Sequence, residues 1–155
     1  SDELYSSLIQ IGVNILLNES VLIEHADITI TGLKDYTVKG MKMPRKITLP
    51  YEATRLCGSR NYSIVLSHRP EIAEQYAAAG ADLVLCGHAH GGLAALPFNK
   101  RLFTPDEGFF PSYAYGKYVI GKTIMIVNAG LGYTGIPARI FNRPEIGVIN
   151  LIPKK

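Results

Sequence analysis

A buried strand, a short helix and a second buried strand follow one another between residues 62 and 86. The first run is YSIVLS, residues 62–67, and the second lies within ADLVLC, residues 81–86. Between them, Pro70 fits the first turn of a helix, where its missing N–H group is not needed, and Gly80 is a typical helix end. A strand–helix–strand unit of this length places its two strands parallel in one sheet. The chain is therefore predicted to be an α/β protein.

The flanking sequence predicts further elements around this unit. Asp2 can cap a helix that Gly12 ends, and the Pro- and Gly-rich stretch 96–121 is expected to be a long loop with a hairpin. Other apolar runs predict one or two helical turns at 51–58 and strands at 13–18, 20–26, 27–33, 122–130 and 145–152. The first three strands are expected to form an antiparallel meander. The total is about seven strands with two or three helices.

Three of the four histidines follow the two strands of the central unit. His68 comes after the first strand, and His88 and His90 come after the second, in the sequence LVLCGHAHGGL. The carboxyl ends of neighbouring parallel strands lie about 5 Å apart, so these side chains are expected to meet at one sheet edge. Open α/β sheets bind ligands at this edge, and imidazole suits zinc, iron and manganese. The pattern predicts a metal site.

Length and composition limit the other possibilities. With 155 residues and 47% hydrophobic residues, the chain can form a single domain with a substantial core. A formal net charge of +3 without a clustered basic face gives no reason to expect nucleic acid as a stable partner. Cys57 and Cys86 form no CxxC pair and are interpreted as reduced packing residues. No run of about 18 apolar residues is present to span a bilayer.

Carboxylates are missing from the predicted metal site. A site for two metal ions normally needs bridging carboxylates, yet Asp82, Asp106 and Glu107 have no ligand-like spacing, and Asp82 lies at the opposite end of its strand. His25, alone in LIEHADI, is interpreted as a solvent-facing strand residue.

The sequence resembles the C-terminal half of calcineurin-like metallophosphoesterases, in particular the bacterial branch with a GHxHGG block. The resemblance covers nearly the whole chain and is carried by VLSHRPE, ADLVLCGHAHGG and the tail from GFFPSYAYGKY to NRPEIGVINL. It implies a four-layer α/β/β/α sandwich, of which residues 1–155 are the C-terminal portion of a single domain. It also implies a dinuclear centre with two divalent ions, Mn, Fe or Zn, in which His68 and His88 bind one metal and His90 the other.

The resemblance also implies what the chain does and what it lacks. The full-length protein, of which this chain would be the C-terminal part, would hydrolyse small phosphate esters as a phosphatase or phosphodiesterase. It would lie in the cytoplasm or be associated with the cytoplasmic side of a membrane. The family's Asp-x-His, Gly-Asp and Gly-Asn-His-Asp motifs are absent, so this chain is expected to be inactive alone and to self-associate or pair with an N-terminal half. Leu93 replaces a Gln that often follows the two glycines in this branch.

Two rival interpretations stay open. The chain could be a non-catalytic scaffold or binding module on the same fold, although such a module has no need for three convergent imidazoles. Alternatively, His68, His88 and His90 could form a self-sufficient site for one zinc ion. The aromatic residues Phe109, Phe110, Tyr113 and Tyr115 are expected to cover the sheet edge as core rather than to line a substrate groove.

Overall fold

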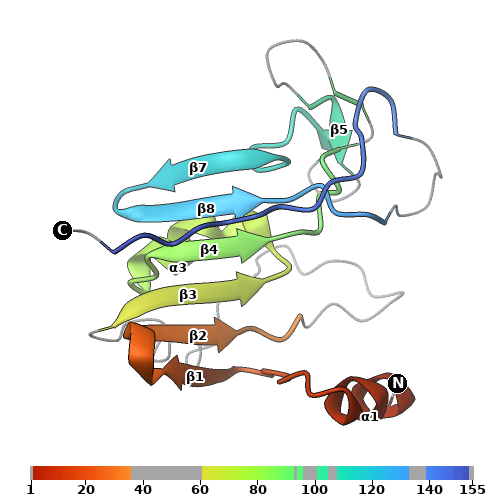
Figure 1. The fold of residues 1–155 in the computed structure, drawn as a ribbon. Coiled ribbons are helices and arrows are strands. Elements are labelled where there is room, and N and C mark those ends of the chain that lie inside the picture. The colour runs from red at the N-terminus through yellow and green to blue at the C-terminus, as the bar shows by residue number, and fades with distance from the viewer. Residues whose placement is uncertain are drawn as a thin grey trace.

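The fold is built on one six-stranded sheet (Figure 1). The computed structural model describes residues 2–35, 61–92, 94–95, 101–104, 108–132 and 139–153. The strand order is β1-β2-β3-β4-β8-β7, and a separate hairpin pairs β5 with β6. The strands are β1 (Glu19–Ile23), β2 (Ile28–Gly32), β3 (Tyr62–Ser67), β4 (Leu83–Cys86), β5 (Phe103–Thr104), β6 (Gly108–Phe109), β7 (Gly116–Ile120) and β8 (Thr123–Val127).

The predicted strand–helix–strand unit is confirmed. Strand β3 runs parallel to β4, and the connection contains a 3-10 turn η2 (Pro70–Ile72) followed by helix α3 (Ala73–Ala78). Gly80 follows the helix with a φ of 86°, which a residue with a side chain rarely adopts. Strands β2, β3, β4 and β8 are all parallel, and the antiparallel β1 and β7 form the two edges. The α/β prediction is therefore confirmed.

Helix α3 covers one face of the sheet and builds the core there. Val65, Val84 and Met125 lie side by side on β3, β4 and β8, and all three are fully buried. Tyr76 of α3 is fully buried against the same cluster. Large apolar side chains removed from water supply most of the free energy that holds the helix on the sheet.

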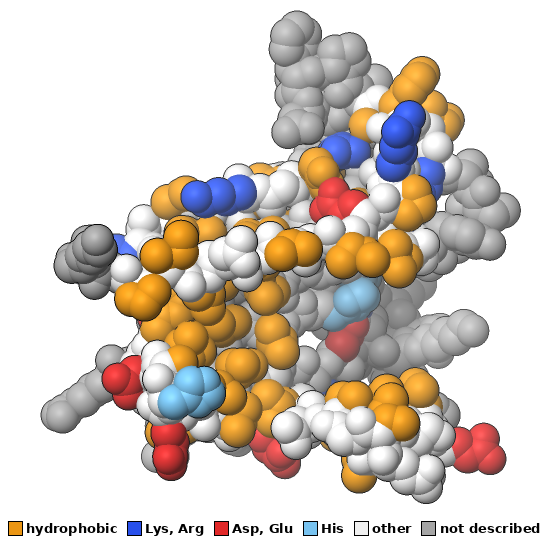
Figure 2. Space-filling model, in the orientation of Figure 1, with side chains coloured by type: hydrophobic (Ala, Val, Ile, Leu, Met, Phe, Trp, Pro, Cys, Tyr) orange, Lys and Arg blue, Asp and Glu red, His pale blue; other side chains and the backbone are white. Residues whose placement is uncertain are grey.

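The opposite face of the sheet, here called the open face, is also apolar. Its side chains form two rows across the parallel strands, because residues in register on parallel strands point to the same side. The rows are Ile30–Ile64–Leu83–Ile124 and Gly32–Leu66–Leu85–Ile126. Leu66 is 40% exposed. Figure 2 shows apolar side chains spread over this side of the molecule. The face is thus only partly covered within the described part of the chain.

Several sequence-based expectations for individual elements are wrong. The helix near the N-terminus is present as α1 (Asp2–Gln10), but residues 13–18 form no strand, so the meander reduces to the antiparallel pair β1–β2. Leu16 instead lies against Gly32, where a Cβ atom would be 2.4 Å from the Leu16 Cβ. The run 145–152 belongs to no strand, and Gly116–Ile120, expected as loop, is strand β7. The helical turns expected at 51–58 lie outside the described residues.

A second, smaller structure extends from the carboxyl edge of the sheet. The hairpin β5–β6 is the one expected within residues 96–121, and isolated bridges join Ala94 to Ile140 and Ala95 to Arg101. Two parts of the chain that are distant in sequence therefore meet beside the glycine-rich turn. The short 3-10 element η1 (Glu24–Ala26) connects β1 to β2. No described helix is long and apolar enough to cross a membrane.

Candidate metal centre

His68 and His88 meet at the carboxyl edge of the sheet, as the sequence predicts. Ser67 at the end of β3 is in register with Cys86 at the end of β4, so the residues that follow leave the sheet side by side. The His68 and His88 rings have their centroids 4.7 Å apart and cross at 72°. His90 belongs to the same turn, two residues further along the chain.

The turn that carries His88 and His90 has an unusual backbone. Both histidines have positive φ angles, 66° and 48°, and Gly91 and Gly92 follow with 70° and 73°. Non-glycine residues adopt this left-handed region at a cost of about 1–3 kcal/mol each, so the surrounding structure must hold them there. Such strain is concentrated at functional sites.

Arg69 lies at the candidate site, which the sequence pattern does not predict. Its guanidinium is almost completely buried, and its Nη1 atom lies 2.8 Å from Nε2 of His88. The same guanidinium contacts Asp35 Oδ1 at 3.1 Å and Glu71 Oε1 at 3.3 Å. Both carboxylates are thereby engaged by a cation. The position directly after His68 was the available signal, but nothing in the sequence shows that its side chain turns toward His88.

The turn around His68 is fixed by Tyr76 of α3. The Tyr76 hydroxyl donates to the Arg69 carbonyl at 2.6 Å, so Ser67 Oγ, 2.7 Å away, donates to Tyr76. Ser67 Oγ also accepts from the Arg69 backbone N–H at 3.2 Å. The helix that covers the sheet therefore also determines where His68 leaves it.

The electrostatic surroundings favour the neutral forms of His68 and His90. Partial burial lowers the pKa of His68, and the neighbouring His88 lowers it further. Partial burial also lowers the pKa of His90, with Arg139 contributing in the same direction. A neutral imidazole is the form that binds a metal ion, so the residues suit that role chemically.

The described side chains do not form a complete metal site by themselves. No group of three His, Cys, Asp or Glu side chains within the described ranges is arranged so that it could hold an ion. A self-sufficient zinc site made by His68, His88 and His90 is therefore not supported. The imidazoles fit divalent metals as ligands, but the carboxylates such a centre needs are not supplied by Asp35 or Glu71, which contact Arg69.

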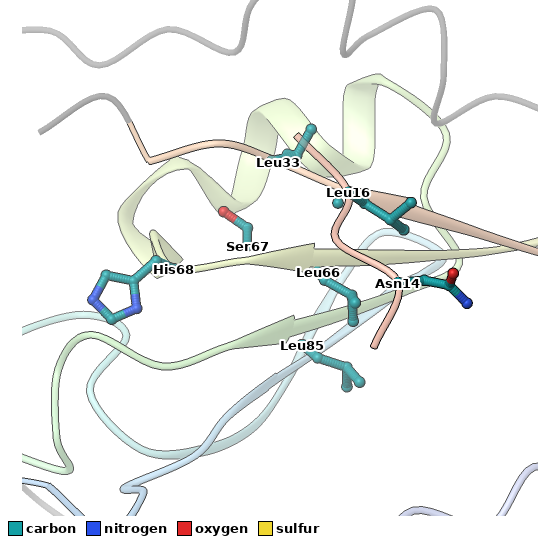
Figure 3. A pocket seen from close by; sticks show the side chains of 8 residues that line it. Asn14, Leu16, Leu33, Leu66, Ser67, His68 and Leu85 are labelled. Carbon is teal, nitrogen blue, oxygen red and sulfur yellow. The ribbon is translucent and has the colours of Figure 1, made fainter. Parts of the chain in front are cut away.

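An open hollow of about 330 Å³ adjoins His68 (Figure 3). Its lining is polar and apolar in about equal parts and comes from the carboxyl ends of β2, β3 and β4 and from the segment before β1. The residues are Asn14, Leu16, Gly32, Leu33, Leu66, Ser67, His68 and Leu85. The hollow thus joins the carboxyl edge to the open face.

The C-terminal segment, residues 139–153, contacts the histidine turn from the other side. Asn142 is 4% exposed and donates through Nδ2 to the carbonyl oxygens of His90 and Gly92, at 2.7 and 2.6 Å. Glu145 accepts hydrogen bonds from Asn128 at 2.9 Å and from Tyr115 at 2.7 Å. The apolar run 145–152 predicts a strand here, and no local pattern predicts the contact with the histidine turn.

Other residues singled out from the sequence have structural explanations. Asp82 accepts from the Ser63 backbone N–H at 2.8 Å, at the amino end of the strands and away from the histidines. His25 is exposed, as expected, but it lies in the 3-10 element η1 and not in a strand. Cys86 is a buried free thiol, and burial raises its pKa to about 12. Cys57, Leu93, Asp106 and Glu107 lie outside the described residues.

The aromatic residues divide into two groups. Phe109 and Phe110 are 70% and 65% exposed, so the expectation that they belong to the core is wrong. Tyr113 packs against the core cluster, and Tyr115 carries the Arg101 guanidinium 4.0 Å above its ring.

Comparison with known proteins shows similarity to metallophosphoesterases. The chain is 42% identical over 103 residues to the uncharacterized metallophosphoesterase YkuE of Bacillus subtilis. The matched region covers 65% of this chain and 35% of YkuE. The chain is 30% identical over 143 residues to an uncharacterized metallophosphoesterase of Aquifex aeolicus, covering 90% of this chain and 51% of that protein. It is 32% identical over 89 residues to the phosphodiesterase YaeI of Escherichia coli, covering 57% of this chain and 32% of YaeI.

The chain spans about half the length of these relatives or less. No family model matches the sequence, and no solved structure matches it.

Proposed function

Because the chain belongs to the calcineurin-like metallophosphoesterase family, we propose that it supplies the histidine side of a centre that hydrolyses phosphate esters. In this proposal residues 1–155 are the C-terminal portion of a single metallophosphoesterase domain. His68 and His88 bind one divalent ion, Mn, Fe or Zn, and His90 binds a second. The observation that carries the proposal is the 4.7 Å separation of the His68 and His88 rings at the carboxyl edge of parallel strands.

The proposed reaction divides between the metal ions and the protein. Two divalent ions, held in part by His68, His88 and His90, would supply Lewis acidity toward water and the phosphate oxygens. The chain's own residues lower the pKa of His68 and His90, fix the turn that carries His90 and place Arg69 beside His88. A guanidinium at this position suits the oxygens of a phosphate ester. The substrate is proposed to be a small phosphate ester, either a monoester or a diester.

We propose that the open face is covered by the rest of the domain. Parallel sheets are found almost entirely with both faces covered, whereas here α3 covers one face only. The relatives extend well beyond the matched region, so additional chain is available in proteins of this kind. In the isolated chain a second copy would take its place, which gives self-association. A cytoplasmic or membrane-associated location stays a prediction.

A binding role on the same fold is the alternative function. The contact between Arg69 and Nε2 of His88 favours it, because a guanidinium there competes with a metal ion for the imidazole. A scaffold would keep the contact between Arg69 and His88 when it binds its partner. An enzyme would have to open it whenever His88 binds metal through Nε2.

Hydrolysis of p-nitrophenyl phosphate and bis-p-nitrophenyl phosphate with added Mn²⁺ tests the proposal. The longest natural polypeptide that contains residues 1–155 should hydrolyse at least one of them, and His88→Ala should lose most of that activity. The control His25→Ala, an exposed histidine far from the edge, should keep it. The 155-residue chain alone should be inactive. Full activity in His88→Ala would contradict the proposed metal ligands. Full activity in the 155-residue chain would contradict the proposal that this chain supplies only part of the centre.

A further inference from the structure

We propose that Asn142 is a positioning residue for His90, holding the turn that presents this imidazole to a metal ion. The inference rests on the proposed function, since it concerns the same centre. It adds a residue that is 52 positions distant in sequence from the histidine it positions. The contact between the Asn142 side chain and the His90 backbone thus connects the C-terminal segment to the proposed metal centre.

The turn from His88 to Gly92 does not hold itself in place. Local hydrogen bonds join Ala89 N–H to the Gly87 carbonyl at 2.8 Å and Gly92 N–H to the Ala89 carbonyl at 2.7 Å. These bonds form a tight turn, but the left-handed φ angles of His88 and His90 remain costly. Contacts from elsewhere in the fold are needed to keep His90 in this conformation.

Asn142 supplies those contacts through both N–H bonds of one buried amide. Its Nδ2 donates to the carbonyl of His90 at 2.7 Å and to the carbonyl of Gly92 at 2.6 Å. Its Oδ1 accepts from Arg101 Nη1 at 3.3 Å, which fixes the orientation of the amide. A buried amide with its donors satisfied in this way resists rotation, because any other orientation leaves polar groups unpaired.

Gly91 leaves room for this amide because it has no side chain. A Cβ atom at Gly91 would lie 2.6 Å from Oδ1 and 3.0 Å from Nδ2 of Asn142. The glycine between the two accepting carbonyls therefore gives the amide its room, in addition to adopting a φ of 70°. The position of the Asn142 amide therefore requires a residue without a side chain at position 91.

The ring of His90 is held from the same side of the molecule. The backbone of Gly132 hydrogen-bonds the imidazole, and the Gly132 carbonyl in turn accepts from Arg139 Nη2. Arg139 also donates to the Ala129 carbonyl at 2.9 Å. Metal-binding histidines commonly have one ring nitrogen oriented by a backbone carbonyl, and removing such support lowers metal affinity about 10–100-fold.

The test uses the 155-residue chain, Zn²⁺ alone as the probe, and the NMR chemical shifts of the individual imidazole nitrogens. Asn142→Asp keeps the shape and the acceptor for Arg101 but removes both donors. In the unsubstituted chain Zn²⁺ should shift the nitrogen signals of His68, His88 and His90. In Asn142→Asp the Zn²⁺ concentration that shifts His90 should rise about 10-fold or more, while that for His68 stays unchanged.

Tyr115→Phe is the matched control. It removes the hydrogen bond from Tyr115 to Glu145 in the same C-terminal segment but touches neither the His90 nor the Gly92 carbonyl. Its response to Zn²⁺ should equal that of the unsubstituted chain. If Asn142→Asp does not fold by circular dichroism, Asn142→Ser, which keeps one donor, takes its place.

Three results decide the matter. Equal Zn²⁺-induced shifts of His90 in the unsubstituted and Asn142 variants overturn the inference and leave the proposed function standing. Absence of a shift at all three imidazoles of the unsubstituted chain counts against the proposed metal site instead. In that case the metal-free nuclear Overhauser effect between the His90 ring and Gly132 decides: its loss in Asn142→Asp supports positioning, and its persistence overturns it.

Discussion

At the scale of single residues, the histidine turn depends on a glycine that no other residue can replace without cost. Gly91→Ala should lower the free energy of unfolding by about 1–3 kcal/mol, because alanine adopts a φ of 70° unfavourably and its Cβ would meet the Asn142 amide. Urea denaturation measures the loss. The control Gly121→Ala has a similar φ of 61° with no heavy atom near its Cβ, so it should lose less. Equal losses would mean that the Asn142 contact contributes nothing.

Cys86 gives a second prediction for a single residue. Burial raises the pKa of its thiol to about 12, so the reactive thiolate is essentially absent at neutral pH. In a Cys57→Ser background, Ellman's reagent should react with Cys86 only after the chain unfolds. Rapid reaction in the folded chain would show that the carboxyl end of β4 opens to solvent.

At the scale of elements, α3 connects the core to the site through Tyr76. Tyr76→Phe should destabilise the fold by about 1–3 kcal/mol, because the buried Arg69 carbonyl and Ser67 hydroxyl lose their partner. Thermal unfolding followed by circular dichroism checks this. Tyr113→Phe removes an exposed hydrogen bond to Glu74 and should cost less. A larger loss in Tyr113→Phe than in Tyr76→Phe would contradict this explanation.

How well each element could be predicted depends on the range of the interactions that form it. The parallel pair β3–β4 with its helix was predictable, since continuous apolar runs and helix-ending residues are local signals. Residues 13–18 and 145–152 have equally apolar sequences, yet neither forms a strand. Their conformation depends on contacts such as Leu16 with Gly32 and Glu145 with Asn128, which no local pattern reveals.

The same distinction between local signals and long-range contacts applies to the candidate site. The positions of His68 and His88 at one edge followed from the parallel strands, and their contact confirms that expectation. Arg69 and Asn142 were missed because their roles arise from side-chain direction and from a contact across 52 residues. The roles of His68, His88 and His90 as metal ligands stay predictions.

At the scale of the whole molecule, the open face is the feature that most needs a partner. The isolated chain should self-associate as its concentration rises, because water-exposed apolar side chains such as Leu66 gain from burial. Leu66→Lys should weaken this association, whereas Leu4→Lys, on the exposed surface of α1, should not. Analytical ultracentrifugation distinguishes them, and a chain that stays monomeric at high concentration would contradict the expectation.

The number of metal ions bound per chain tests the central claim most directly. Inductively coupled plasma mass spectrometry on the longest natural polypeptide containing residues 1–155, purified with Mn²⁺, should find two ions per chain. The double variant His68→Ala/His88→Ala should lose at least one of them, because these rings lie 4.7 Å apart at the proposed centre. Two ions retained in that variant would show that the carboxyl edge of β3 and β4 is not where the metal binds.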